Sequence, residues 1–207
     1  MGLLNRQQSA AGGIVHGLAH WQVAGLLVAV CLAMALFGEA GRETFMYNRM
    51  SVENGEYWRL MSGHFVHLGP THLVLNMAGL VLVWLLVGRY FNTIQWLAVL
   101  GIALAVTSAG FWFVDRYLLW YVGLSGVLHG LLLAGAIRGF RTLPSESAII
   151  VAIVVAKLAY EQLAGPMPGS ESVSGGAVVV NAHFFGAIGG IVAAAVLWRS
   201  APPDRSI

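Results

Sequence analysis

The sequence predicts an all-α integral membrane protein, built as a bundle of six transmembrane helices. Of its 207 residues, 58% are hydrophobic and only 10% are charged, and the mean hydropathy is +0.76. A soluble domain has roughly 25% charged residues, so the deficit indicates that lipid surrounds most of the chain. The apolar residues also gather into separate runs, each close to the roughly 20 residues that a helix needs to cross a bilayer.

These runs define one membrane domain over 21–198. The six runs are residues 21–38, 71–88, 93–114, 117–137, 147–164 and 178–198. We expect a tail at 1–20, a second tail at 199–207, and a long loop at 39–70 between the first two helices. Glycine, proline or polar residues favour helix ends in the other gaps, which contain Gly88-Arg89, Asp115-Arg116, Arg141–Pro144 and Gly165–Gly176.

The first run has a competing interpretation as a secretory signal. Gly38-Glu39-Ala40 faintly resembles the small-x-small pattern of a cleavage site. The run is long for a signal core, however, and only Arg6 supplies positive charge before it. We therefore expect an uncleaved first helix.

The arginines favour a cytoplasmic N-terminus, because cytoplasmic segments of membrane proteins carry more Lys and Arg. In that orientation the inner segments carry Arg6, Arg89, Arg138, Arg141, Arg199 and Arg205. The outer segments carry Arg42, Arg49, Arg59 and Arg116. Helices two, four and six then all begin at the outer face, and the loop at 39–70 lies outside.

This topology brings four polar residues to one depth. His72 and Asn76 lie in the first turns of the second helix, Ser125 near the start of the fourth, and His183 near the start of the sixth. At about 1.5 Å rise per residue, all four lie within a turn or two of a common level. Chance rarely supplies such a coincidence in apolar helices.

The residue types at that level suit nucleophilic catalysis. A serine hydroxyl needs an adjacent base to take its proton, and His183 can serve Ser125 in this way. His72 and Asn76 are spaced i,i+4 and project from one helix face, where they and the Ser125 N–H could stabilise an oxyanion. Helices two, four and six have no acidic residue in their outer parts, so the sequence predicts a Ser–His dyad.

Glycines would let the helices that carry the dyad approach closely. Gly126-x-x-x-Gly130 and Gly186-x-x-x-Gly190 have the small-xxx-small spacing of close helix pairs. Together with Gly123, which precedes the serine, they provide the room that a short serine side chain needs to reach a histidine on another helix.

Composition and spacing exclude several kinds of site. The net charge is +2 without a basic run, so nucleic acid is not an expected partner. Cys31 is the single cysteine, which excludes an intrachain disulfide and a multi-cysteine metal site. His64, His67 and His72 lack the glutamate of the His-Glu-x-x-His metalloprotease motif, and Pro70 interrupts the stretch. We expect no metal and no cofactor.

Three further polar residues lie inside the predicted helices. His129 is one turn below Ser125, where a packing or hydrogen-bonding role is favoured and support of the site is the alternative. Lys157 and Glu161 are i,i+4 partners in the fifth run, where a lone charge would cost about 2.5–3.5 kcal/mol. We expect them to pair; the alternative is that Glu161 attracts basic residues of a substrate.

Four motifs, in this order along the chain, resemble the rhomboid intramembrane serine proteases: Tyr57-Trp58-Arg59, His72-x-x-x-Asn76, Gly-Leu-Ser-Gly at 123–126, and Ala182-His183-x-x-Gly186. The resemblance covers about residues 55–195. It implies a six-helix rhomboid-like bundle in which Ser125 is the nucleophile, His183 the general base, and His72 with Asn76 the oxyanion donors. It also implies that Trp58 and Arg59 belong to an outer loop that braces the site.

The string Gly-Leu-Ser-Gly-Val-Leu-His-Gly at 123–130 and Lys157-Leu-Ala-Tyr-Glu-Gln resemble the rhombosortase branch more closely. This implies cleavage of exported bacterial proteins that carry a C-terminal Gly-Gly motif, one hydrophobic helix and basic residues. It also implies the inner membrane, with the site open to the periplasm. The alternatives are a non-catalytic rhomboid-like protein that escorts clients, and a small transporter with a proton relay.

Overall fold

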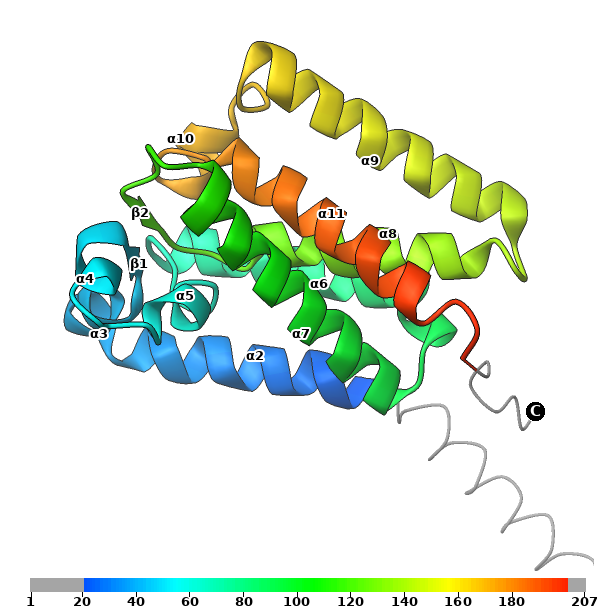
Figure 1. The fold of residues 1–207 in the computed structure, drawn as a ribbon, viewed down its shortest axis with the longest axis horizontal. Coiled ribbons are helices and arrows are strands. Elements are labelled where there is room, and N and C mark those ends of the chain that lie inside the picture. The colour runs from blue at the N-terminus through cyan, green and yellow to red at the C-terminus, as the bar shows by residue number, and fades with distance from the viewer. Residues whose placement is uncertain (1–20, 201–207) are drawn as a thin grey trace, which may run out of the picture.

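Helices make up nearly all of the regular structure in the computed structural model, which describes residues 21–200 (Figure 1). Within those residues the only strands are two of two residues each, β1 (Tyr47–Asn48) and β2 (Trp120–Tyr121). The predicted all-α fold is therefore confirmed. The predicted tail at 1–20 and most of the tail at 199–207 lie outside the described residues.

One long helix occupies each of the six predicted apolar runs. These are α2 (Trp21–Leu36), α6 (Pro70–Val87), α7 (Thr93–Ala109), α8 (Ser125–Gly139), α9 (Pro144–Ala164) and α11 (Val180–Val196). Pro70 and Pro144 occupy first-turn positions, where a missing N–H costs nothing. Asn92 and Gln95 form a capping box at the start of α7. Local sequence thus fixes where three of these helices begin.

Length and composition identify fewer than six membrane spans among the described residues. Three helical stretches are long and apolar enough to cross a bilayer: Pro70–Tyr90, Thr93–Val114 and Pro144–Ala164. A fourth would be α2 joined to α3 (Gly38–Phe45), although the two are bent by 114°. The 15 residues of α8 rise only about 22 Å, and α11 is also short. The count of six spans stays a prediction.

The segment predicted as an outer loop at 39–70 is folded. It contains most of α3, strand β1, and two short helices, α4 (Arg49–Glu53) and α5 (Arg59–Ser62). The Arg59 guanidinium donates to Glu56 Oε2 at 2.5 Å and to the carbonyls of Glu43 and Met46 at 2.7 and 3.0 Å. One buried arginine therefore ties three parts of this segment together.

Two contacts attach this outer segment to the chain that leads into α8. Strands β1 and β2 pair antiparallel, with Tyr47 opposite Tyr121. Farther along, the Gly123 N–H donates to the Gly63 carbonyl at 3.1 Å. The residues immediately before α8 are thereby held on both sides, which fixes the starting point of that helix.

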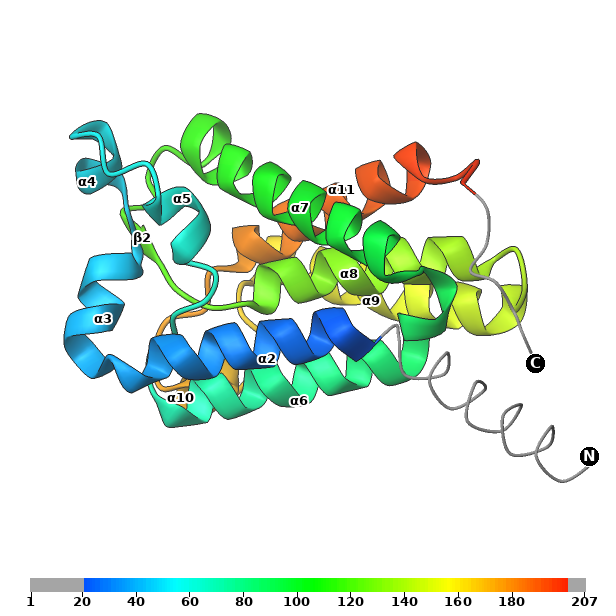
Figure 2. The same ribbon diagram turned by 90° about the horizontal axis from the view of Figure 1, so that it is seen from below.

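Helix α8 lies at the centre of the bundle, with α6, α7, α9 and α11 packed around it (Figures 1 and 2). Its closest partner is α11. Gly126 faces the Ala182 carbonyl, and a Cβ added there would lie only 2.7 Å from that oxygen. A Cβ on Gly130 would lie 2.6 Å from the Gly186 carbonyl oxygen. The two predicted glycine faces therefore meet, and their backbones are in direct contact.

Helix α9 is packed on one side only. It contacts α8 and α11 and lies at the edge of the bundle, away from α2 (Figure 1). The loop after α9 leads through the short helix α10 (Ser170–Ser174) to α11, and α10 contacts α6. The remaining short elements are the 3-10 turn η1 (Gly88–Tyr90) and the π-helical turn η2 (Gly110–Val114), which extend α6 and α7.

The close contact of α8 with α11 predicts that Gly186→Ala destabilises the protein. The new Cβ would collide with the Gly126 carbonyl group, and forcing an extra carbon into a packed core typically costs about 1–3 kcal/mol. Gly101→Ala in α7 is the matched control, because no atom lies within 4 Å of its added Cβ. We expect a lower thermal unfolding midpoint in detergent for Gly186→Ala alone; equal midpoints for the two variants would contradict the packing described.

Candidate active site

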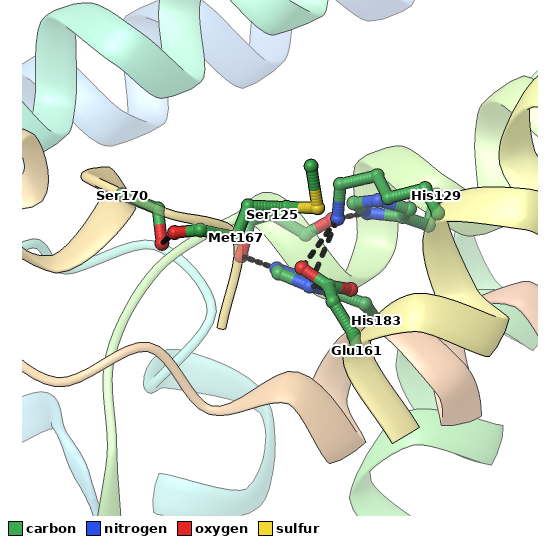
Figure 3. Close-up of polar contacts among 7 residues, drawn as sticks. Ser125, His129, Glu161, Met167, Ser170 and His183 are labelled. Carbon is green, nitrogen blue, oxygen red and sulfur yellow. Dashed lines mark hydrogen bonds and ion pairs between the residues drawn. The ribbon is translucent and has the colours of Figure 1, made fainter. Parts of the chain in front are cut away.

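Ser125 and His183 meet where α8 and α11 begin. Ser125 is the first residue of α8 and His183 the fourth of α11. The two side chains face each other across the glycine contact, with Ser125 Oγ 3.1 Å from His183 Nε2 (Figure 3). This is hydrogen-bond distance, so the hydroxyl lies within reach of a base.

A tight turn sets the position of Ser125. Gly123 has φ +118°, a conformation that disfavours residues with a Cβ. The Tyr121 hydroxyl donates to the Gly123 carbonyl at 2.6 Å and holds the turn from below. Because Ser125 opens the helix, its backbone N–H has no acceptor within α8. That N–H is a free donor beside the hydroxyl of the same residue.

His72 presents a donor to the same turn. The Leu68 N–H donates to His72 Nδ1 at 3.3 Å, which places the ring proton on Nε2. That Nε2 lies next to Gly123, since a Cβ at position 123 would be 2.9 Å away from it. The neighbouring ring of His67 lies edge-on, with the ring centroids 5.2 Å apart. Burial lowers the pKa of His67 to about 3, so this neighbour is uncharged at neutral pH.

Asn76 lies one turn further along α6. Its amide nitrogen donates one hydrogen to the His72 carbonyl at 3.0 Å, and a primary amide has a second hydrogen to donate. The Asn76 side chain is buried and lines the cavity that contains Ser125 and His183. His72, Asn76 and the Ser125 N–H therefore supply three donors near one hydroxyl.

An acidic residue reaches His183 from a helix that the sequence did not single out for this role. Glu161 of α9 places Oε2 2.9 Å from His183 Nδ1 (Figure 3). Its Oε1 accepts from Lys157 Nζ at 2.7 Å. The expected ion pair between Lys157 and Glu161 thus forms, and it continues to the histidine. The i,i+4 spacing predicted the pair, whereas no sequence pattern indicates which neighbouring helix it faces.

His129 lies next to His183 and Ser125. Its ring stacks on that of His183, with centroids 4.3 Å apart and planes 24° from parallel. Its Nδ1 lies 2.7 Å from the Ser125 carbonyl oxygen, one turn earlier in α8. His129 therefore contacts both the serine backbone and the imidazole, and its support of the site stays a prediction.

The site opens into an apolar cavity of about 580 Å³ between α6, α8, α9 and α10. Leucine and valine side chains of α6 and α8 form much of its wall, and the polar side chains of Ser125, His183 and Glu161 line it as well. Met167 and Ser170, in and just after the loop that follows α9, line the same cavity, and the Ser170 hydroxyl donates to the Met167 carbonyl (Figure 3). An apolar segment of polypeptide is the kind of molecule that such a cavity accommodates.

Two other groups singled out from the sequence lie away from this cavity. His64 is buried beneath the outer segment, with Nε2 3.1 Å from Ser108 Oγ and its ring against Phe111 and Tyr121. Arg59 is buried and Trp58 about half exposed in the outer segment. The structure connects them to the site only indirectly, through the contacts of that segment with the turn at Gly123.

A comparison with protein-family models matches the Rhomboid domain over residues 54–200 of this chain. A comparison with curated proteins finds no match. The matched region includes every residue of the site and all long helices except α2. The chain therefore belongs to the rhomboid family, whose members are all-α, multi-pass membrane proteins and in general intramembrane serine proteases.

The geometry of the turn predicts that Gly123→Ala destabilises the protein in two ways. Alanine would have to adopt φ +118°, and its Cβ would lie 2.7 Å from the His72 ring. Gly165→Ala separates the two effects, because Gly165 also has a positive φ (+88°) but nothing lies within 4 Å of an added Cβ. We expect Gly165→Ala to lose about 1 kcal/mol through strain and Gly123→Ala distinctly more, measured as unfolding midpoints. Equal losses would show that His72 does not lie against the turn.

Proposed function

We propose that this rhomboid-family chain is an intramembrane serine endopeptidase with Ser125 as nucleophile and His183 as general base. The observation that carries the proposal is the 3.1 Å contact between Ser125 Oγ and His183 Nε2 in the wall of an apolar cavity. A serine becomes nucleophilic when an adjacent base accepts its proton. A serine and a histidine that faced lipid would gain nothing from this hydrogen bond that an apolar pair could not supply.

Acylation begins when Ser125 Oγ attacks the carbonyl carbon of the scissile peptide. The Oγ–H bond breaks, its proton passes to His183 Nε2, and the carbonyl electron pair moves onto oxygen. When that oxyanion collapses, the C–N bond breaks and the leaving amine takes the proton from His183. Water then attacks the acyl-enzyme by the same route. Attack by an amine instead of water would transfer the acyl group, and both outcomes pass through the same acyl-enzyme.

Three donors are suitably placed for the oxyanion: His72 Nε2–H, the second amide hydrogen of Asn76, and the Ser125 N–H. Donors fixed before the reaction stabilise the developing charge without reorganisation. The glycine at 123 is what lets the His72 ring approach the turn before Ser125 so closely. Gly123 and Gly126 thus serve the site by leaving space on either side of Ser125.

The cavity favours a transmembrane or C-terminal anchor helix as substrate. Its walls are apolar and it extends along α6 and α9, so the substrate reaches it from the lipid. A helix must unwind before its carbonyl is accessible, which favours glycine near the cleavage site. The likeness of residues 123–130 to the rhombosortase branch supports the narrower proposal that exported proteins with a Gly-Gly C-terminal tail are cleaved. Bacterial inner membrane and a periplasmic site follow from that proposal.

We expect Ser125→Ala to abolish cleavage of a reporter with a Gly-Gly motif followed by a hydrophobic helix. His183→Ala should reduce cleavage to a similar degree, because the two residues act as a unit. A fluorophosphonate probe should label the wild type and not Ser125→Ala. Ser145→Ala, an exposed serine in the first turn of α9, is the control and should behave like the wild type.

The same experiment discriminates among the rival functions. An escort protein would still bind the reporter and never cleave it, and a transporter would keep its transport in Ser125→Ala. Probe labelling that persists without the Ser125 hydroxyl would refute the assignment of the nucleophile.

Removal of an oxyanion donor should lower kcat much more than it changes KM. Asn76→Ala or His72→Phe is expected to reduce kcat about 10²–10³-fold, the usual effect of losing one such donor. Asn54→Ala, which changes an exposed asparagine of the outer segment, is the control and should keep the wild-type kcat. An unchanged kcat in Asn76→Ala would remove Asn76 from the oxyanion site, whereas the Ser125 assignment would stand.

A further inference from the structure

We propose that Glu161 is a positioning residue that completes a Ser–His–Glu triad and sets the tautomer of His183, an inference that rests on the proposed function. Glu161 projects from α9 with its side chain only 2% exposed. Each carboxylate oxygen has its own partner: Oε1 is 2.7 Å from Lys157 Nζ, and Oε2 is 2.9 Å from His183 Nδ1. Ser125, His183 and Glu161 therefore form one continuous hydrogen-bonded chain (Figure 3).

The tautomer matters because His183 can accept the serine proton only at an unprotonated Nε2. A neutral imidazole has one N–H and one lone pair, and the partner of one nitrogen determines which form the other takes. A carboxylate accepts and cannot donate. Glu161 at Nδ1 therefore keeps the proton on Nδ1 and leaves the Nε2 lone pair directed at Ser125 Oγ.

Lys157 competes with Glu161 for the Nδ1 atom of His183. Its ammonium group lies 3.4 Å from the same His183 Nδ1. An ammonium can only donate, so its bond to Nδ1 would force the proton to Nε2 and abolish the base. The shorter contact to Glu161 draws the ammonium toward the carboxylate and balances the negative charge within the apolar helix.

The other imidazoles near His183 do not set its tautomer. His129 of α8 stacks on the ring, and His72 of α6 lines the same cavity. Neither makes a hydrogen bond to Nδ1. A purely structural ion pair between Lys157 and Glu161 would need only one carboxylate oxygen, whereas the second is directed at the imidazole.

The decisive variant is Glu161→Gln, which keeps the size of the side chain. The glutamine amide can donate to Nδ1 through its nitrogen and accept from Lys157 through its oxygen, so it selects the wrong tautomer. The corresponding change in a soluble serine-protease triad lowers kcat about 10⁴-fold. We expect a loss on the order of 10²–10⁴-fold in kcat for the Gly-Gly reporter, a KM within about threefold of wild type, and a parallel fall in the rate of fluorophosphonate labelling. Glu161→Asp should recover at least a tenth of wild-type kcat.

Two further variants separate positioning from folding. Glu146→Gln replaces an exposed glutamate of the same helix and should leave kcat unchanged. The double variant Lys157→Met, Glu161→Met removes both charges, so no unpaired charge remains in the helix. We expect its unfolding midpoint to return toward that of the wild type while kcat stays low, because a methionine side chain offers Nδ1 no hydrogen-bond acceptor.

Two results would overturn this inference. One is a kcat for Glu161→Gln within threefold of wild type; the other is restored kcat in the double variant, which would show that Glu161 only neutralises Lys157. If wild type cleaves the reporter and Ser125→Ala does not, the proposed function stands in either case. If Ser125→Ala still cleaves, the proposed function itself is refuted.

Discussion

The contact between the backbones of α8 and α11 is the constraint on which the rest of this structure depends. Glycine residues face each other along the crossing, and a single methyl group on Gly186 would overlap the Gly126 carbonyl. Lipid gives helices no hydrophobic reason to associate, so close packing of small residues takes that role. The same approach places the first residue of α8 against the first turn of α11. A short serine side chain can therefore reach an imidazole on another helix.

The outer segment provides a second constraint, on the chain that precedes Ser125. Strand pairing with β1 and the hydrogen bond from Gly123 to Gly63 hold this chain in an extended path before the helix begins. The left-handed turn at Gly123 then directs it into α8 and leaves space for the His72 ring. The backbone before α8 thus positions both Ser125 and the turn against which the His72 ring lies. Arg59, buried within the outer segment, contributes at a distance by holding that segment together.

The buried charge of Glu161 in the apolar helix α9 explains why Lys157 and His183 gather around it. Glu161 is buried within a helix that is long and apolar enough to cross a membrane, where an unpaired carboxylate would be costly. Lys157 and His183 each bond one of its oxygens. The carboxylate is thereby satisfied, and the imidazole is oriented by the same interaction. Structural pairing and the proposed positioning role are two consequences of one arrangement.

The sequence by itself determined the helices and the depth of the polar residues along them. Apolar runs report where a chain can reside in lipid, and a fixed rise per residue converts position in the run into depth. That is why His72, Asn76, Ser125 and His183 could be assigned to one level, and why the glycine faces could be recognised from their spacing. The structure then decided how each helix is rotated about its axis and which neighbour it meets. Helices that are apolar on all sides carry little sequence signal for rotation. The contact of Glu161 of α9 with His183 therefore emerged only from the packing of the bundle. The short helices within 39–70 likewise became evident only in the tertiary structure.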